Sequence, residues 1–222
     1  MYKLFCDILT NVSFYDYELD DELWVDCYGE CGYDHISSLN AIEWCRSGAS
    51  KLVIALEGVE DYVIKIPLHG EAYYDADQQR FILEDKGDVE EWEYNYCELE
   101  AQKYVDMVQE TDGFEKMFAA TTFEGFYGMV PIYVSDRVQS HFCYRASDDS
   151  KNKVRRYKDD THDNTFSDTL MSMFVECWGF DDTVELGRIL REHEIDDDII
   201  FRNCGVDKQG RIVILDYSGF HS

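Results

Sequence analysis

The sequence contains only two prolines, Pro67 and Pro131, and no apolar run long enough to cross a bilayer. We expect no signal peptide, because no basic start is followed by an apolar stretch. Basic residues are also scarce: 20 lysines and arginines stand against 47 aspartates and glutamates, and the formal net charge is −27. Such a chain repels phosphate backbones. The sequence therefore predicts a cytoplasmic protein with no direct nucleic-acid binding and no membrane association.

Several catalytic and metal-binding signatures are missing as well. The sequence has no Gly-x-Ser-x-Gly, no His-Glu-x-x-His and no P-loop lysine motif, and its six histidines are dispersed. The eight cysteines are scattered, and we expect reduced thiols. Cys27, Cys31, His35 and Cys45 could in principle bind zinc. The three residues between the first two cysteines fit common zinc motifs poorly, so no zinc site is predicted.

The chain does have enough apolar material for a folded core. Its 222 residues are 45% hydrophobic and 15% aromatic, which allows one large domain or two small lobes. The acidic surface would attract basic proteins, including those that bind nucleic acid. The other interpretation is that the excess charge only keeps the protein soluble.

Short apolar segments rich in β-branched residues predict strands, the first two of which are joined by a turn at Gly58. The predicted strands cover residues 52–56, 62–66, 80–83, 118–126, 130–134 and 211–215. The strand at 80–83 lies in a polar region, 70–91, that is otherwise predicted to be a loop or insertion. An acidic, aromatic extension over residues 1–46 precedes the strands, and residues 39–44 are expected to close a short helix within it.

Helices are predicted over residues 90–109, 166–178 and 183–193. Residues 147–164 form the most hydrophilic segment and are predicted to be an exposed loop. This order of elements predicts an α+β protein with two lobes. The apolar face of the first helix repeats at helical spacing and comprises Cys97, Ala101, Tyr104, Val105 and Val108.

One lysine interrupts an apolar strand. Lys65 lies at the centre of the predicted strand 62–66, where its ammonium must face solvent, a cleft or a carboxylate. The following helix offers Glu98 and Glu100, both on the flanks of its apolar face. Helical periodicity cannot choose between these two glutamates, and an exposed lysine on an open sheet face is the competing interpretation.

The strongest pattern lies near the C-terminal end. Asn203 follows Asp198 by five residues, and Asp216 follows Asn203 by thirteen, with a predicted hairpin between them. The sequence thereby resembles the protein kinase superfamily, whose catalytic loop and Asp-Phe-Gly motif keep these spacings. The segment from Asp216 to Gly219 resembles that motif with one residue added and tyrosine in place of phenylalanine. The form most resembled is the small, divergent kinase-like proteins of bacteriophages, thought to act on host machinery.

The resemblance implies ATP and Mg²⁺ as cofactors and a role for each matched residue. Lys65, which resembles the kinase strand lysine, would bind phosphates and be held by Glu100. Asn203 and Asp216 would bind Mg²⁺, and Asp198 would be the catalytic carboxylate. A thin phosphate-binding turn would comprise Ser47, Gly48 and Ser50.

The resemblance also implies a two-lobed protein-kinase-like fold. Residues 47–138 would form an antiparallel-sheet N-lobe, and residues 139–222 a truncated helical C-lobe. Residues 135–138 would be the hinge. The sequence stops at residue 222, so it shows no activation segment and no helical subdomain for peptide substrates.

Three departures from the kinase pattern keep a second function open. The glycine-rich loop is reduced to one glycine, Asp196 and Asp197 replace the His-Arg pair, and Ile200 replaces the catalytic-loop lysine. One hypothesis is therefore a Ser/Thr protein kinase that acts on host proteins. The alternative is a non-catalytic pseudokinase whose acidic surface binds and blocks a basic host or phage-defence protein.

Overall fold

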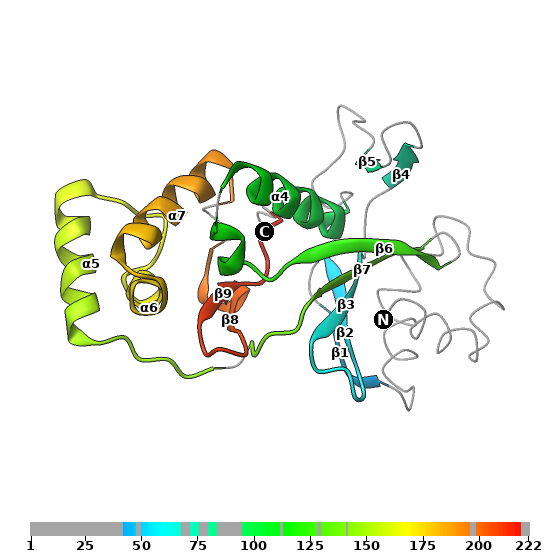
Figure 1. Cartoon of the computed structure of the whole chain (residues 1–222), viewed down its shortest axis with the longest axis horizontal. Coiled ribbons are helices and arrows are strands. Elements are labelled where there is room, and N and C mark those ends of the chain that lie inside the picture. The colour runs from blue at the N-terminus through cyan, green and yellow to red at the C-terminus, as the bar shows by residue number, and fades with distance from the viewer. Residues whose placement is uncertain are drawn as a thin grey trace. The chain divides into compact units, whose positions relative to one another are not determined.

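The fold is α+β, as the sequence predicts, and the chain divides into two compact units (Figure 1). Unit 1 contains residues 1–102 and 120–137, and unit 2 contains residues 103–119 and 138–222. The domain boundaries inferred from the kinase resemblance stay a prediction. The computed structural model describes residues 42–47, 50–67, 72–75, 80–83, 95–111, 113–127, 130–140, 142–195 and 199–218.

Unit 1 is built on a five-stranded sheet in the order β1-β2-β3-β7-β6, with every neighbouring pair antiparallel. The four strand predictions at 52–56, 62–66, 118–126 and 130–134 are confirmed, although β6 begins three residues later than predicted. The strands are β1 (Ile42–Ser47), β2 (Lys51–Leu56), β3 (Tyr62–Pro67), β6 (Thr121–Tyr127) and β7 (Val130–Asp136).

The prediction of a helix over residues 39–44 is wrong for its described part. Residues 42–44 belong to β1, which pairs along β2 as far as Ser47. Ile42 and Cys45 are buried while Glu43 between them is exposed. The physical reason is tertiary: strand pairing and burial outweigh the local preference of a short segment.

Residues 70–91, predicted as a loop with a single strand, contain two paired strands. The predicted strand at 80–83 is confirmed as β5 (Arg80–Leu83), and it pairs antiparallel with β4 (Ala72–Asp75). The hairpin forms a separate two-stranded sheet.

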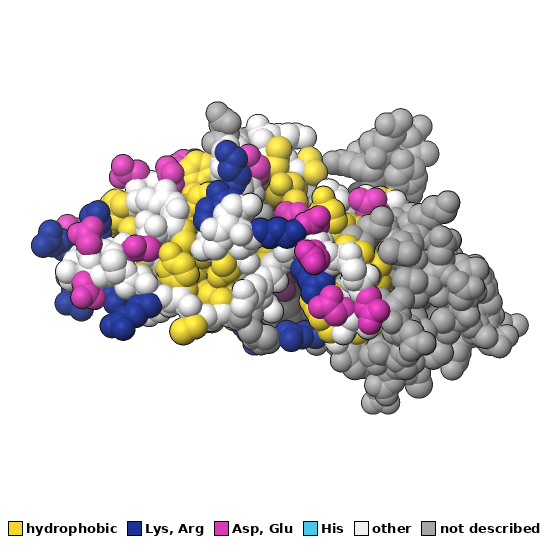
Figure 2. Space-filling view, turned by 60° about the horizontal axis from the view of Figure 1, so that its bottom comes forward, with side chains coloured by type: hydrophobic (Ala, Val, Ile, Leu, Met, Phe, Trp, Pro, Cys, Tyr) yellow, Lys and Arg dark blue, Asp and Glu magenta, His cyan; other side chains and the backbone are white. Residues whose placement is uncertain are grey.

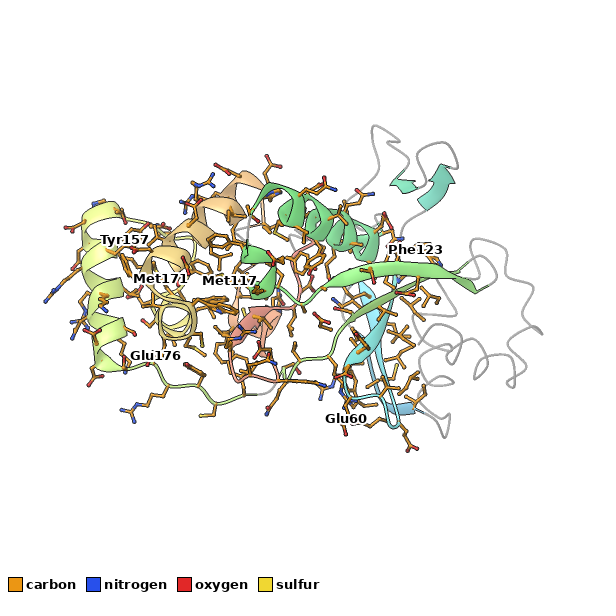
Figure 3. The ribbon with its side chains drawn as sticks, viewed as in Figure 1. Glu60, Met117, Phe123, Tyr157, Met171 and Glu176 are labelled. Atoms are coloured by element: carbon orange, nitrogen blue, oxygen red, sulfur yellow. The ribbon has the colours of Figure 1, made fainter. Side chains whose placement is uncertain are left out.

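The two faces of the large sheet differ in chemistry. One face carries fully buried aliphatic side chains, among them Leu52, Ile54, Ile64, Ile66 and Ile132. The first turns of α4 (Tyr96–Glu110) pack on the other face, where Cys97 and Ala101 contact Tyr133, with Phe123 alongside (Figure 3). This second face also holds the charged groups described below.

Part of the apolar face predicted for α4 is wrong. Val105 and Val108 are exposed, whereas Met107 is fully buried in the core of unit 2. The helix passes from unit 1 into unit 2 after Gln102, so its two halves pack on different cores. A single stripe of helical periodicity cannot describe a helix that changes partners along its length.

Unit 2 is mainly helical and has one core. Met117 and Met171 both contribute to it (Figure 3), together with Phe174 and Ile214. The predicted helices at 166–178 and 183–193 and the predicted strand at 211–215 are confirmed. The elements are η4 (Phe114–Met117), α5 (Asp148–Thr161), α6 (Asp168–Trp178), α7 (Phe180–Glu192), η6 (Phe201–Asn203), β8 (Cys204–Val206) and β9 (Ile212–Ile214).

The prediction of an exposed loop over residues 147–164 is wrong, because this segment contains α5. Ser147 caps the helix by accepting a hydrogen bond from the Ser150 backbone N–H at 3.3 Å. Glu176 on α6 accepts hydrogen bonds from both serine hydroxyls, at 2.6 Å each. Within α5 the buried positions are Ser150 and Val154, so the sequence offers almost no apolar periodicity.

Asp163 joins the end of α5 to α7. Its carboxylate accepts hydrogen bonds from the Thr165 N–H at 2.9 Å and the Tyr157 hydroxyl at 2.8 Å, and it lies 3.2 Å from Arg191. Burial raises the pKa of Asp163, but these hydrogen bonds and the arginine charge outweigh it and bring the pKa to about 2.

We therefore expect Asp163 to make unit 2 acid-sensitive. Its pKa is lower in the folded protein than the unfolded value of about 3.9, so its contribution is complete above about pH 4 and is lost as the pH falls toward 2. After allowance for solvent screening, that contribution is about 1 kcal/mol. Urea denaturation of the wild type and Asp163→Asn at pH 7 and pH 3 measures it. A stability difference that does not shrink toward pH 3 would contradict the assignment.

Among the described residues, no helix combines the length and the apolar character needed to cross a bilayer. No disulfide joins the described cysteines. Burial raises the pKa of Cys45 and of Cys204 to about 12, so both thiols are protonated and unreactive near neutral pH.

Candidate functional site

Lys65 and Glu100 form a buried ion pair in unit 1. Lys65 on β3 is 6% exposed and Glu100 on α4 is fully buried. The lysine ammonium donates to Oε1 of Glu100 and lies 3.3 Å from Oγ1 of Thr121. The Thr121 hydroxyl donates to the same carboxylate oxygen. Lysine is rarely buried unless it is paired, and here the interactions of Lys65 join β3 to α4 and β6.

The structure brings Lys65 to Glu100 and places Glu98 elsewhere. The Glu98 carboxylate accepts a hydrogen bond from the Tyr133 hydroxyl at 2.7 Å and one from Gln102 at 3.0 Å. The Glu98 backbone N–H donates to Oδ1 of Asn95, the residue that caps α4. Burial raises the pKa of Glu98, although the bonds from Tyr133 and Gln102 act in the opposite direction.

Asn95 and Glu98 stand three residues apart at the helix start, the spacing of a capping box. In the structure Asn95 accepts from the backbone N–H of Glu98, while the Glu98 carboxylate accepts from Tyr133 and Gln102. The spacing therefore marks the start of α4 and does not by itself choose between Glu98 and Glu100.

Lys51 is a site residue that the sequence reasoning missed. It is the first residue of β2 and is only 5% exposed, and its ammonium lies 2.6 Å from Oε2 of Glu100. In the antiparallel register Val53 lies opposite Lys65, so Lys51, two residues earlier, shares the sheet face of Lys65. Only the register of β2 against β3 shows that Lys51 and Lys65 share a face. The sequence does not give that register until the position of the hairpin turn is known.

The proposed phosphate-binding turn lies between β1 and β2. Ser47 ends β1 opposite Leu52, and the Ser50 residue that precedes Lys51 is buried. Gly48 and the side chain of Ser47 lie outside the described part of the chain. The role of this turn stays a prediction.

The predicted hinge, residues 135–138, is anchored to β1 and to the β2–β3 turn. Arg137 makes a bidentate contact with Glu43, at 2.5 and 2.8 Å, and donates to the Val59 carbonyl at 2.8 Å. The hydrogen bond to Glu43 raises the pKa of the Arg137 guanidinium. Asp136 accepts a hydrogen bond from the Ala120 N–H at 3.0 Å, and burial raises its pKa against the opposing effects of that bond and of the Lys65 charge.

In unit 2, a hairpin places Asn203 beside Asp216. Cys204 pairs with Ile214 in the β8–β9 ladder, so Asn203 is opposite Leu215. The Asn203 carbonyl accepts hydrogen bonds from the backbone N–H groups of Leu215 at 2.8 Å and Asp216 at 3.5 Å. The thirteen-residue spacing seen in the sequence is therefore the length of this hairpin.

The turn of the hairpin is fixed by Asp207 and Gly210. One carboxylate oxygen of Asp207 accepts from the backbone N–H groups of Gln209 at 2.9 Å and Arg211 at 2.8 Å. Gly210 has a φ of 78°, a left-handed conformation that glycine adopts at little cost. This local turn chemistry holds the register that brings the two predicted metal ligands together.

Tyr217, the predicted counterpart of the motif phenylalanine, has a defined place in the core. It is fully buried, and its hydroxyl donates to the Ala119 carbonyl at 2.8 Å. Its ring lies edge-on to Phe118, with 5.2 Å between centroids. The next residue, Ser218, donates to Oδ1 of Asp216 at 3.1 Å. The buried hydroxyl of Tyr217 therefore has a hydrogen-bond partner, and its ring packs in the core of unit 2.

The predicted catalytic Asp198, with Asp196 and Asp197, lies outside the described residues, so its role stays a prediction. Ile200, predicted to take the place of the kinase lysine, is 39% exposed, and Phe201 beside it is also exposed and stacks on Phe142. The alternative that Arg202 partly substitutes for that lysine stays a prediction.

Asn203 and Asp216 fit a Mg²⁺ site in donor type, because an amide oxygen and a carboxylate are hard oxygen ligands. In the part of the chain that the structure describes, no three His, Cys, Asp or Glu side chains gather in a way that could hold a metal ion. Of the zinc candidates, Cys27, Cys31 and His35 lie outside the described residues, and Cys45 is a buried thiol of β1.

Comparison with known proteins gives structural matches only. No protein-family model matches the chain, and no curated protein does. The matching structures include the bifunctional kinase-methyltransferase WbdD, with 13% sequence identity and a TM-score of 0.35. The match covers 80% of this chain and 34% of that one, so this chain spans about a third of that protein's length. At this level of similarity, nothing about the site passes from that protein to this chain.

Proposed function

We propose that this chain is a kinase-like protein that binds ATP with Mg²⁺ and transfers its γ-phosphoryl group to a Ser or Thr hydroxyl of a protein. The observation that carries the proposal is the buried contact of Lys65 with Glu100. A strand lysine held by a helix glutamate is the arrangement that protein kinases use to bind nucleotide phosphates.

The proposed chemistry assigns one task to each residue. Lys65 binds phosphate oxygens and Glu100 fixes its position, while Asn203 and Asp216 hold Mg²⁺ in unit 2. A Mg²⁺ ion held by these two residues would neutralise charge on the phosphates. Asp198 accepts the proton of the attacking hydroxyl as the new O–P bond forms, and the bond between the γ-phosphorus and the bridging oxygen breaks to release ADP.

Binding is tested by thermal unfolding with and without Mg²⁺–ATP. ATP at a hundred times its dissociation constant stabilises the folded protein by about 2.7 kcal/mol, which corresponds to a rise in Tm of about 5 °C or more. We expect the rise in the wild type and its loss in Asp216→Asn. Asp160→Asn, at an exposed position on α5, is the matched control and should keep the rise. No rise in the wild type would refute nucleotide binding.

A second candidate function is a non-catalytic pseudokinase that binds a basic host protein. The exposed apolar Ile200, where kinases have a lysine, favours it. In Figure 2 acidic and basic side chains are interspersed on the visible face of the described residues. The net charge of −27 therefore does not appear there as one acidic patch. An inhibitor acting through its surface would keep its activity in both Lys65→Met and Asp216→Asn.

A further inference from the structure

Two lysines, not one, converge on Glu100. Lys65 on β3 contacts Oε1, and Lys51 on β2 lies 2.6 Å from Oε2, so each carboxylate oxygen has its own ammonium partner. Both lysines are almost completely buried. They come from neighbouring antiparallel strands and share one sheet face, on which α4 packs.

A contribution to the stability of the fold does not by itself explain why position 51 is a lysine. A buried ammonium loses hydration free energy, and its attraction to a carboxylate often only compensates for that loss. A methionine of similar length would fill the same position on the sheet without the loss. The presence of the second ammonium therefore points to a task that needs positive charge.

The location of Lys51 indicates which task this is. It directly follows Ser50 and begins the strand that leaves the proposed phosphate-binding turn. The side chain thus starts at that turn and ends at the carboxylate that holds Lys65. Lys51 therefore links the proposed phosphate-binding turn to the Lys65–Glu100 pair, the two parts of the proposed nucleotide site that contact phosphate.

We propose that Lys51 is a second phosphate-binding lysine, which acts with Lys65 on the polyphosphate of a nucleoside triphosphate. Glu100 holds the two ammonium groups in place through its two oxygens. The inference rests on the proposed nucleotide binding. If Lys51 binds phosphate, the affinity of the protein for a nucleotide depends on the number of its phosphates. Each lysine then contributes to the binding of ATP, while neither contributes to the binding of adenosine.

The test is the affinity of Lys51→Met for ATP, ADP and adenosine, measured by isothermal titration calorimetry in the presence of Mg²⁺. We expect about ten-fold weaker ATP binding, a smaller loss for ADP and no change for adenosine. Lys51→Arg should recover most of the ATP affinity, because it keeps the charge. Lys153→Met, which removes an exposed lysine of α5, is the control and should bind ATP as the wild type does.

The outcomes separate this inference from the proposed function. If Lys51→Met binds ATP as tightly as the wild type while Lys65→Met does not bind it, the proposed role of Lys51 is overturned and the proposed function stands. Equal losses for ATP and adenosine make Lys51 a structural residue and also overturn it. A wild type that binds no nucleotide refutes both proposals.

A measurement on the wild type covers the case in which Lys51→Met does not fold. An acyl phosphate of ATP acylates lysine amines that lie next to its phosphates. Mass spectrometry should find the label on Lys51 as well as on Lys65, and excess ATP should suppress both. Label on Lys65 without label on Lys51 would count against the inference.

Discussion

Glu100→Gln is expected to destabilise the protein by about 3–5 kcal/mol, the usual cost of removing one partner from a buried ion pair. Gln has nearly the same volume as Glu, so no cavity forms. What changes is charge: the ammonium groups of Lys51 and Lys65 lose the carboxylate that each contacts, and Thr121 loses a charged acceptor. Urea denaturation followed by far-UV circular dichroism measures the loss.

Glu98→Gln is the matched control, two residues earlier on the same helix. Glu98 is buried and its pKa is raised, so the folded protein already disfavours its charge. Its two oxygens accept from the Tyr133 hydroxyl and from Gln102. A glutamine keeps one oxygen to accept from Tyr133, and its NH2 group can donate to the side-chain oxygen of Gln102 once that amide rotates. The control should therefore cost less than about 1 kcal/mol. Equal losses for the two variants would show that the lysines are not held by the charge of Glu100.

Glu98 and Glu100 show how much of the candidate site can be predicted from the sequence. Lys65 is recognisable in the sequence because a charged residue inside an apolar strand is unusual, and the kinase resemblance selects Glu100 as its partner. In the structure Tyr133 and Gln102 engage the Glu98 carboxylate, and Glu100 contacts Lys65. The Tyr133 contact depends on the position of β7, which no local pattern of the sequence encodes.

Sequence separation decides which pairs could be predicted. Asn203 and Asp216 belong to one hairpin whose turn is set by Asp207 and Gly210, so their proximity follows from nearby residues. The contact of Lys51 with Glu100 spans 49 residues and depends on the register of β2. No short-range pattern encodes such a register, and a shift of one residue would place Lys51 on the opposite face.

The errors in secondary structure have the same cause. The sequence does not predict α5, because this polar segment buries few side chains. The cap that stabilises the helix also depends partly on Glu176 of α6. The sequence does not predict β1, because the pairing of this segment with β2 determines its conformation. In both cases, contacts with another element outweigh the intrinsic preference of the segment.

Asp198→Asn is expected to lower the rate of phosphoryl transfer by about 10² to 10⁴-fold, the usual contribution of a positioned general base. The variant keeps the size of the side chain and loses its basicity. ATP affinity should be unchanged, because the proposed phosphate ligand is Lys65 and the proposed metal ligands are Asn203 and Asp216. Transfer from [γ-³²P]ATP to a histone, chosen as a basic acceptor for this acidic chain, measures the rate.

The sequence supplies an unusually close control, because Asp197 adjoins Asp198. Asp197→Asn makes the same change of charge one residue away, and adjacent residues cannot both occupy the catalytic position. Neutralising either aspartate relieves repulsion within the acidic run, so a general electrostatic effect would appear in both variants. A loss confined to Asp198→Asn identifies the catalytic carboxylate. Equal rates in the two variants would remove Asp198 from the mechanism, and a wild type that binds ATP without transfer would favour the pseudokinase.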